Sequence, residues 1–457
     1  MKRHFFTAVG VTCLAAISLR AVVSGNDTPR DLRPFKDSTG SVLTITADPS
    51  FESNNPFFQS LGTNGRSCGT CHQASDAWTV TPTHVNERFD ASNGLDPIFW
   101  VNDGANCSAA DVSTLGARRR AYSLLLAKGL IRIELAMPAK AEFSLIDFDD
   151  PYGCISASQL SMYRRPLPTT NLKFLSTVMW DGREMHAGKT MAFNFTEQAR
   201  DATLGHAQGV SPTDRELQQI VAFDLGLFTS QIRDHHAGRL DDDGAAGGPA
   251  ALARQPFFIG INDPIGLNPT NAPFDPRAFS LFNAWMRSHD DDEHDEDARE
   301  ARRAIGRGQE LFNTRPIDIA GVGGLNDALG AATIPGTCTT CHDTPNAGNH
   351  SVSMALNIGT SDASRRTPDL PLYTFTCNTT GDTIKTSDPG RALITGKCAD
   401  LGKVKGPILR ALAARPPYFH NGSAASLHEV VDFYDQRFQL HLKRQEKSDL
   451  VAFLRSL

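Results

Sequence analysis

The stretch Ser67-Cys68-Gly69-Thr70-Cys71-His72 returns far downstream as Thr337-Cys338-Thr339-Thr340-Cys341-His342. Both stretches read CxxCH, two cysteines three positions apart followed directly by a histidine. Two thiols at this spacing can add to the two vinyl groups of one haem, and the adjacent histidine can ligate the iron. The chain's 9 Cys and 14 His would produce only about 0.005 such motifs by chance. The sequence therefore predicts two covalently bound haem c groups, each held by the cysteines and the histidine of one motif.

A zinc site built from the two CxxC pairs is the main alternative reading of these cysteines. Pairs that share one zinc usually lie roughly 15–20 residues apart, whereas these two are separated by more than half of the chain. A zinc site also leaves the two adjacent histidines unexplained. Covalent haem accounts for all six residues.

The N-terminal residues predict export from the cytoplasm. Lys2 and Arg3 precede an apolar run from Phe5 to Leu19, which is shorter than the ~20 residues of a membrane span. We expect residues 1–25 to be a secretory signal peptide and the protein to be periplasmic, with no membrane span. The formal net charge of −6 gives no indication of a nucleic-acid partner.

Four cysteines lie outside the two motifs and the signal segment. An exported protein enters an oxidising compartment, where disulfides persist. The economical pairing is one bond in each half, Cys107 with Cys154 and Cys377 with Cys398. Three connectivities are open from sequence alone, and four buried free thiols are the other alternative.

The length of 457 residues predicts two or three domains, and the two motifs place one covalent haem in each half of the chain. Capping boxes at Thr213-x-x-Glu216 and Ser426-x-x-Glu429 open helical patterns in both halves, and no β-dominated pattern is present. The predicted fold is therefore mostly α, with long loops and little β structure. The expected segments are a polar lead-in over 26–50, an N-terminal domain over 51–287, an acidic linker over 288–297 and a C-terminal domain over 298–457.

A haem iron bound by one histidine has a second axial position. A protein ligand there favours electron transfer, and an open position favours binding of peroxide or dioxygen. Tyr434 falls on the apolar face of a predicted helix with Leu427, Val430 and Val431, so we expect it to point inward. The candidates for a second ligand are Met354, Tyr434, His84, His206 and His350.

Three further stretches, together with the motifs, resemble the bacterial di-haem cytochrome c peroxidase family, which includes the MauG-type enzymes. They are Trp180-Asp181-Gly182-Arg183, Pro417-Tyr418-Phe419-His420-Asn421-Gly422 and Leu427-x-x-Val430-Val431. The resemblance covers most of residues 50–457. It implies two cytochrome c-like domains, in which the N-terminal haem reacts with hydrogen peroxide and the C-terminal haem passes electrons in. We expect a small c-type cytochrome or a cupredoxin as the electron donor. Calcium at the domain interface is also common in the family.

The resemblance also implies roles for single residues. Trp180 matches a tryptophan that relays electrons between the haems, and Gln198 matches an active-site glutamine by its TEQA context. Gln208 stands where the peroxidases have a proton-shuttling glutamate. A glutamine cannot transfer protons in this way, so His206 is the candidate substitute. Tyr434 stands where the peroxidases have a methionine ligand and the MauG-type enzymes a tyrosine. The alternatives are that Trp180 is a core aromatic and that Tyr434 packs without bonding iron.

Together these patterns predict a periplasmic di-haem oxidoreductase that reduces hydrogen peroxide at the His72 haem with electrons relayed through the His342 haem. One alternative is MauG-like oxidation of a protein or organic substrate by peroxide or dioxygen through high-valent haem. Oxygenase chemistry, as in the related rubber-cleaving di-haem dioxygenases, is a second. A non-enzymatic di-haem electron carrier is the third.

Overall fold

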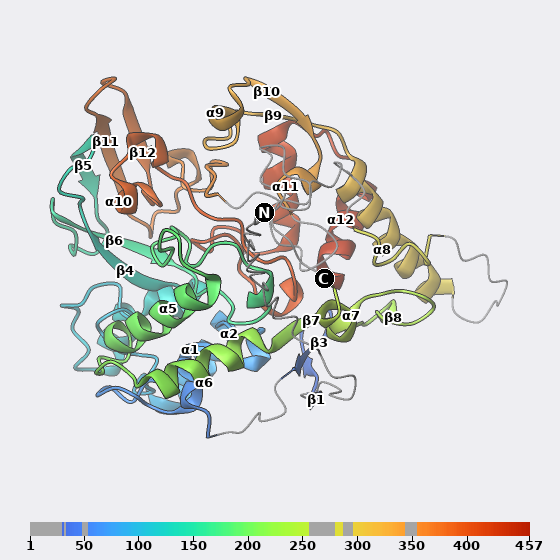
Figure 1. The fold of residues 1–457 in the computed structure, drawn as a ribbon, viewed down its shortest axis with the longest axis horizontal. Coiled ribbons are helices and arrows are strands. Elements are labelled where there is room, and N and C mark those ends of the chain that lie inside the picture. The colour runs from blue at the N-terminus through green and yellow to red at the C-terminus, as the bar shows by residue number, and fades with distance from the viewer. Residues whose placement is uncertain (1–29, 32, 48–53, 256–278, 287–295, 343–353) are drawn as a thin grey trace, which may run out of the picture.

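The computed structural model describes residues 30–31, 33–47, 54–255, 279–286, 296–342 and 354–457. The predicted signal peptide, His350, part of the predicted lead-in and most of the predicted acidic linker lie outside these residues. Figure 1 shows α1, α5 and α6 at the lower left and α8, α11 and α12 on the right. The sheet that contains β5, β11 and β12 lies at the upper left. Within the part described, no helix is both long and apolar enough to cross a membrane.

The cysteines of the first CxxCH motif lie in α1 (Cys68–Cys71), and three helices of the first half pack beside it. They are α2 (Pro82–Ser92), α5 (Met191–Gly205) and α6 (Asp214–Leu225). The predicted capping box of α6 is confirmed, because Thr213 Oγ1 accepts from Glu216 N and Glu216 Oε2 accepts from Thr213 N. The apolar face of α6, which includes Leu217 and Ile220, is buried beside the motif.

Helices of the second half cover the second motif. They are α8 (Glu296–Thr314), α11 (Leu427–Phe438) and α12 (Arg444–Ser456). Gly308 lets α8 and α12 cross closely, because a Cβ atom there would lie 1.9 Å from the carbonyl oxygen of Asp449. Ser426 caps α11 by accepting from Glu429 N, which confirms one half of the predicted capping box. Glu429 Oε2 accepts from Ala425 N instead of Ser426 N, so the other half is not formed. The remaining helices are short: α3 (Leu115–Ala121), α4 (Ser123–Lys128), α7 (Gly248–Ala253), α9 (Asn326–Leu329) and α10 (Ala392–Thr395).

The expectation of little β structure is wrong, because the described residues form four sheets. The largest has the strand order β1-β3-β7-β8, with β2 also paired to β3. Its strands are β1 (Arg30–Asp31), β2 (Phe35–Lys36), β3 (Gly40–Thr46), β7 (Leu227–Asp234) and β8 (Gly238–Arg239). Every residue of β3 is buried, so this stretch of the expected lead-in is part of the core. The hydroxyl side chains of β3 make this stretch look polar in the sequence. In the structure, however, Thr44 Oγ1 and Thr229 Oγ1 lie 2.8 Å apart and form a hydrogen bond inside the sheet.

A three-stranded antiparallel sheet joins the two halves of the chain. Its order is β12-β11-β5, with β5 (Phe143–Asp149), β11 (Leu372–Cys377) and β12 (Thr383–Thr386). The first half therefore supplies an edge strand to a sheet of the second. Two-stranded sheets are formed by β4 (Ile131–Ala136) with β6 (Gln159–Arg164) and by β9 (Ile317–Ala320) with β10 (Thr333–Gly336).

Two disulfides are present, Cys107–Cys154 and Cys377–Cys398. One bond lies in each half of the chain, so the pairing expected from the sequence is confirmed. The free cysteines among the described residues are the four thiols of the two CxxCH motifs.

Candidate haem sites

The two CxxCH segments fold into the same turn. In each, the threonine before the second cysteine accepts from the backbone N–H of the residue before the first, at 2.9 Å from Ser67 to Thr70 Oγ1 and 3.0 Å from Thr337 to Thr340 Oγ1. In each, the backbone N–H of the histidine donates to the carbonyl of the first cysteine at 3.0 Å. The sequence repeat is therefore also a structural repeat, with two thiols and one imidazole on one short segment.

The first motif holds its histidine by a backbone hydrogen bond. His72 Nδ1 lies 2.9 Å from the carbonyl oxygen of Trp78, which accounts for this nitrogen and leaves Nε2 for iron. Burial lowers the pKa of His72 to about 4, so the ring is neutral at pH 7, the form that ligates metals. The ring of Phe57 lies 6.3 Å from that of His72, centroid to centroid. Neutral imidazole, two thiols and aromatic walls fit a haem c.

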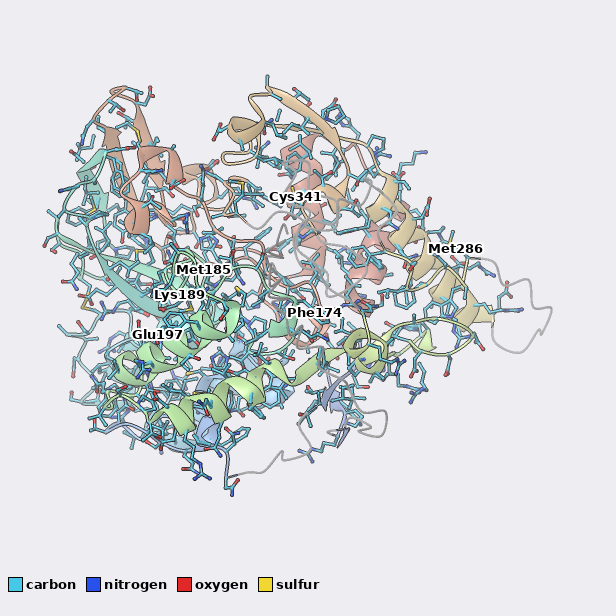
Figure 2. All side chains as sticks on the ribbon, in the orientation of Figure 1. Phe174, Met185, Lys189, Glu197, Met286 and Cys341 are labelled. Atoms are coloured by element: carbon cyan, nitrogen blue, oxygen red, sulfur yellow. A yellow bond between two sulfur atoms is a disulfide. The ribbon has the colours of Figure 1, made fainter. Side chains whose placement is uncertain are left out.

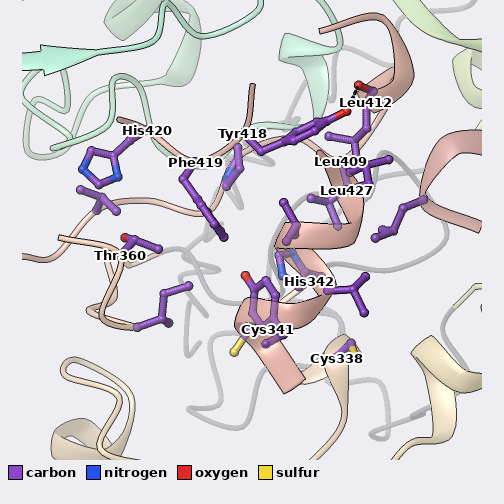
Figure 3. A pocket seen from close by; sticks show the side chains of 18 of the residues that line it. Cys338, Cys341, His342, Thr360, Leu409, Leu412, Tyr418, Phe419, His420 and Leu427 are labelled. Atoms are coloured by element: carbon purple, nitrogen blue, oxygen red, sulfur yellow. Dashed lines mark hydrogen bonds between the residues drawn. The ribbon is translucent and has the colours of Figure 1, made fainter. Parts of the chain in front are cut away.

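The second motif opens into a largely apolar cavity (Figure 3). Burial lowers the pKa of His342 to about 4. Its Nδ1 is buried and has no hydrogen-bond partner among the described residues. Both thiols of the motif line the cavity with the histidine, and much of the remaining lining is aliphatic. This donor set also fits a haem c. The apolar part of the lining includes Phe312, Ile317, Ile319, Leu356, Leu409 and Leu427.

Tyr434 on α11 lies in the same cavity. Its ring centroid is 6.3 Å from that of His342, with the two planes at 72°. Burial raises the pKa of the phenol above its ordinary value, so an isolated Tyr434 stays protonated. The predicted inward direction of this side chain is confirmed. Met354, another candidate ligand, lines the cavity as well.

Trp180 is buried at the wall of this cavity. Its Nε1 donates to the carbonyl oxygen of Arg165 at 2.8 Å, and its ring lies 6.0 Å from that of His420. The next residue, Asp181, is fully buried and accepts from Arg164 at 2.5 Å. These contacts hold the indole in place, which suits either of its predicted roles, an electron relay or a core aromatic.

His206 and Gln208 come together with the loop that precedes the first motif. Arg66 Nη1 donates to the carbonyl oxygen of His206 at 3.3 Å, and Thr63 Oγ1 donates to that of Gln208 at 3.0 Å. The Gln208 side chain is exposed, and its Oε1 accepts from Trp100 Nε1 at 2.9 Å. Both residues therefore lie at the edge of the first site.

The Gln198 side chain is half-buried on α5. Its neighbour Ala199 packs into the cluster that contains Trp78 and, at its margin, Cys68. Figure 2 shows Glu197, on the other side of Gln198 in sequence, far from Cys341 of the second motif. The TEQA segment thus packs, through Ala199, beside the first motif.

Sequence reasoning missed Asp103. Its buried carboxylate contacts both His206 Nδ1 and Arg66 Nη1. Burial raises the pKa of Asp103, but the hydrogen bond and charge of His206 and those of Arg66 outweigh it and hold the pKa below its ordinary value. No motif marks Asp103, because its partner His206 lies 103 residues away in sequence.

His84, a further candidate ligand, has one of its two ring nitrogens engaged by Asp76. Its Nδ1 lies 2.5 Å from Asp76 Oδ1, and its side chain is 39% exposed.

Among the described residues, no group of three His, Cys, Asp or Glu is placed to hold a metal ion, so the structure assigns no ligands to calcium.

Comparison with known proteins gives partial sequence matches. No protein-family model matches the chain. A cytochrome-c peroxidase, IdrP1 of Pseudomonas sp. (strain SCT), is 33% identical over 140 residues, 26% of this chain and 36% of its own length. IdrP2 of Denitromonas iodatirespirans is 33% identical over 132 residues, 27% of this chain and 36% of its own. The cytochrome c551 peroxidase of Nitrosomonas europaea is 41% identical over 70 residues, 15% of this chain and 21% of its own.

The chain thus spans about a third or less of the length of these curated relatives. A solved structure described as a MauG-like protein associated with microbial copper homeostasis aligns over 88% of this chain and 86% of its own, at 16% identity. Its TM-score of 0.36 is too low to support an argument about the fold. Over these partial stretches the chain, which carries two CxxCH motifs, is similar to bacterial proteins named cytochrome-c peroxidases.

Proposed function

We propose that the protein is a periplasmic di-haem c oxidoreductase that reduces hydrogen peroxide at the first motif and takes in electrons through the second. The observation that carries the proposal is the structural repeat of the two CxxCH turns, each with two free thiols and a histidine kept neutral by burial. A bound haem would supply the redox-active iron at each site. The partial matches to proteins named cytochrome-c peroxidases support the reaction class.

At the first motif, the chain supplies a proton-transfer group in His206. The carboxylate of Asp103 accepts from Nδ1 and so fixes the tautomer that leaves Nε2 to bind or release a proton. His206 and Arg66 together hold the pKa of Asp103 below its ordinary value against the effect of burial, and so keep this carboxylate ionised. Gln208 has no titratable group, and its amide oxygen is engaged by Trp100, so it orients its surroundings and transfers no proton.

At the second motif, Trp180 is the candidate electron relay. It lines the cavity that contains His342, and its indole is immobilised by the hydrogen bond to Arg165. Electrons from a small c-type cytochrome or cupredoxin would enter on this side. The buried position keeps the indole out of contact with competing oxidants in solvent.

A MauG-like reaction is the second candidate function, and Tyr434 favours it. A phenolate ligand to the second haem would stabilise ferric iron and make reduction by a donor harder. The absence of a glutamate at Gln208 points the same way, because rapid peroxide turnover needs an efficient proton shuttle. In this variant the oxidising equivalents pass to a protein or organic substrate.

Electron paramagnetic resonance of the diferric protein, before and after peroxide, is the deciding experiment. A pyridine haemochrome assay must first give two c-type haems per chain. Steady peroxide consumption with reduced cytochrome c is the expected result for the peroxidase. Slow consumption with oxidation of an added organic substrate would favour the MauG-like reaction. Two low-spin haems that do not change with peroxide would refute both and leave an electron carrier.

A further inference from the structure

Three cationic side chains line the cavity of the second motif, although its walls are otherwise largely apolar. They are Arg165, Lys405 and Arg415. Their hydrogen bonds to the described residues all go to backbone carbonyl oxygens. Lys405 Nζ donates to Thr177 at 2.9 Å, Arg165 donates to Lys128 and Val80 at 2.8 Å each, and Arg415 Nε donates to Arg410 at 3.2 Å.

None of the three cations forms an ion pair with a carboxylate of the described residues. Arg164 shows the contrast, since it is equally buried but lies between the carboxylates of Asp181 and Asp388. Burial lowers the pKa of Lys405 to about 7, that of Arg165 to about 9 and that of Arg415 to about 10. Buried charges without a counter-ion are costly, so such a cluster indicates an anion that the polypeptide itself does not supply.

The cations lie toward the end of the cavity that faces away from the thiols. Figure 3 shows Cys338 and Cys341 at one end and Tyr418 and His420 at the other. Arg165 and Arg415 are close enough to Tyr418 for their charges to act on its pKa. Lys405 N donates to the carbonyl oxygen of Trp180 at 2.8 Å, and Trp180 packs on His420. A haem joined to the two cysteines through its vinyl groups carries its two propionates on the opposite edge.

We propose that Arg165, Lys405 and Arg415 form an anion site that binds the propionate carboxylates of the haem attached to Cys338 and Cys341. The inference rests on the proposed di-haem assignment and goes beyond it, because it names the residues that set the charge around the second haem. Cations beside the propionates disfavour the extra positive charge of ferric iron. They therefore raise the reduction potential of this haem and oppose the effect of a tyrosinate ligand.

The test is a Lys405→Met substitution in the haem-loaded protein, with the two haems titrated separately by optical spectroelectrochemistry. We expect the reduction equilibrium of the His342 haem to shift toward the ferric form by about tenfold, or 59 mV for one electron, with the His72 haem unchanged. Resonance Raman propionate bands of the second haem should shift as well. The matched control is Lys403→Met. It removes a buried cation two residues away that does not line the cavity and has its own partner, Asp400, at 3.1 Å.

The outcomes separate the possibilities. Suppose that both haems are attached and that the His342 haem has the same potential and the same Raman bands in the Lys405→Met variant as in the control. This result would overturn the proposal and leave the proposed function intact. Fewer than two haems in the wild-type protein would refute the proposed function. A wild-type potential that moves with added acetate at constant ionic strength would show a free carboxylate in the site and overturn the haem assignment. If Lys405→Met does not fold, Arg415→Gln gives the same test with the same expected direction.

Discussion

Replacing Arg164 with methionine should lower the free energy of unfolding by about 3–5 kcal/mol, the usual cost of removing one partner from a buried ion pair. The guanidinium is 1% exposed and lies between two carboxylates, 2.5 Å from Asp181 Oδ2 and 2.7 Å from Asp388 Oδ2. Asp181 would keep Arg183 at 3.1 Å. Asp388 would keep the hydrogen bond from the backbone N–H of Gly390 at 2.8 Å and the contact with His420, which lies 3.6 Å away and is neutral because burial lowers its pKa to about 4. The variant therefore leaves Asp388 as a buried charge with no charged partner.

The same network predicts how stability depends on pH. Burial raises the pKa of Asp181, but Arg164 and Arg183 outweigh it and lower the pKa from 3.8 to about 2. A depressed folded-state pKa stabilises the fold at pH values above 3.8, here by about 2 kcal/mol. This contribution is lost as the pH falls from about 4 to about 2. In the Arg164→Met variant the acid-side loss should be smaller.

Urea unfolding followed by far-ultraviolet circular dichroism, at neutral pH and along an acid series, measures both effects. The control is Arg183→Met, which removes a partner of Asp181 that is 18% exposed and leaves Asp388 paired. The control should be destabilised much less than Arg164→Met. Equal losses in the two variants, or a loss below about 1 kcal/mol for Arg164→Met, would refute the reasoning from buried charge.

The remaining predictions concern the two sites and one disulfide. Tyr434→Phe should change the optical and paramagnetic resonance spectra of the His342 haem alone, and unchanged spectra would mean that the phenol does not bond iron. His206→Gln should lower peroxide turnover by about 10²-fold or more at unchanged haem content, as expected for a proton-transfer group; an unchanged rate would remove it from that role. Cys377→Ser should lower the free energy of unfolding by about 2–4 kcal/mol in urea titrations, and a wild-type midpoint would contradict a stabilising bond.

Local signals in the sequence were reliable where one short segment decides the structure. The capping boxes at Thr213 and Ser426 predicted the starts of α6 and α11, and the helical spacing after Leu427 predicted that Tyr434 points into the protein. Each of these features depends on contacts within one helix. The CxxCH turns belong to the same class, because their hydrogen bonds join residues at most four positions apart.

Long-range pairing was beyond the sequence. The hydroxyl side chains of β3 make the strand look polar in the sequence. Its partner strand β7 lies almost 200 residues away, and only that pairing shows that the Thr44 hydroxyl is hydrogen-bonded inside a sheet. Asp103 carries no motif and acquires a role only when the fold brings it to His206. Lys405 likewise looks like a surface lysine until its burial is known.

The sheet shared by β5 and β11 limits how the two halves can move. Paired backbone from Phe143–Asp149 to Leu372–Cys377 joins them, and the Ser144 side chain adds a hydrogen bond to Asn378 at 2.9 Å. A hinge between the halves would have to break this ladder, so the spacing between the two CxxCH turns should stay constant through a redox cycle. Two fragments produced by cutting the chain between the halves should accordingly remain associated until the protein is unfolded.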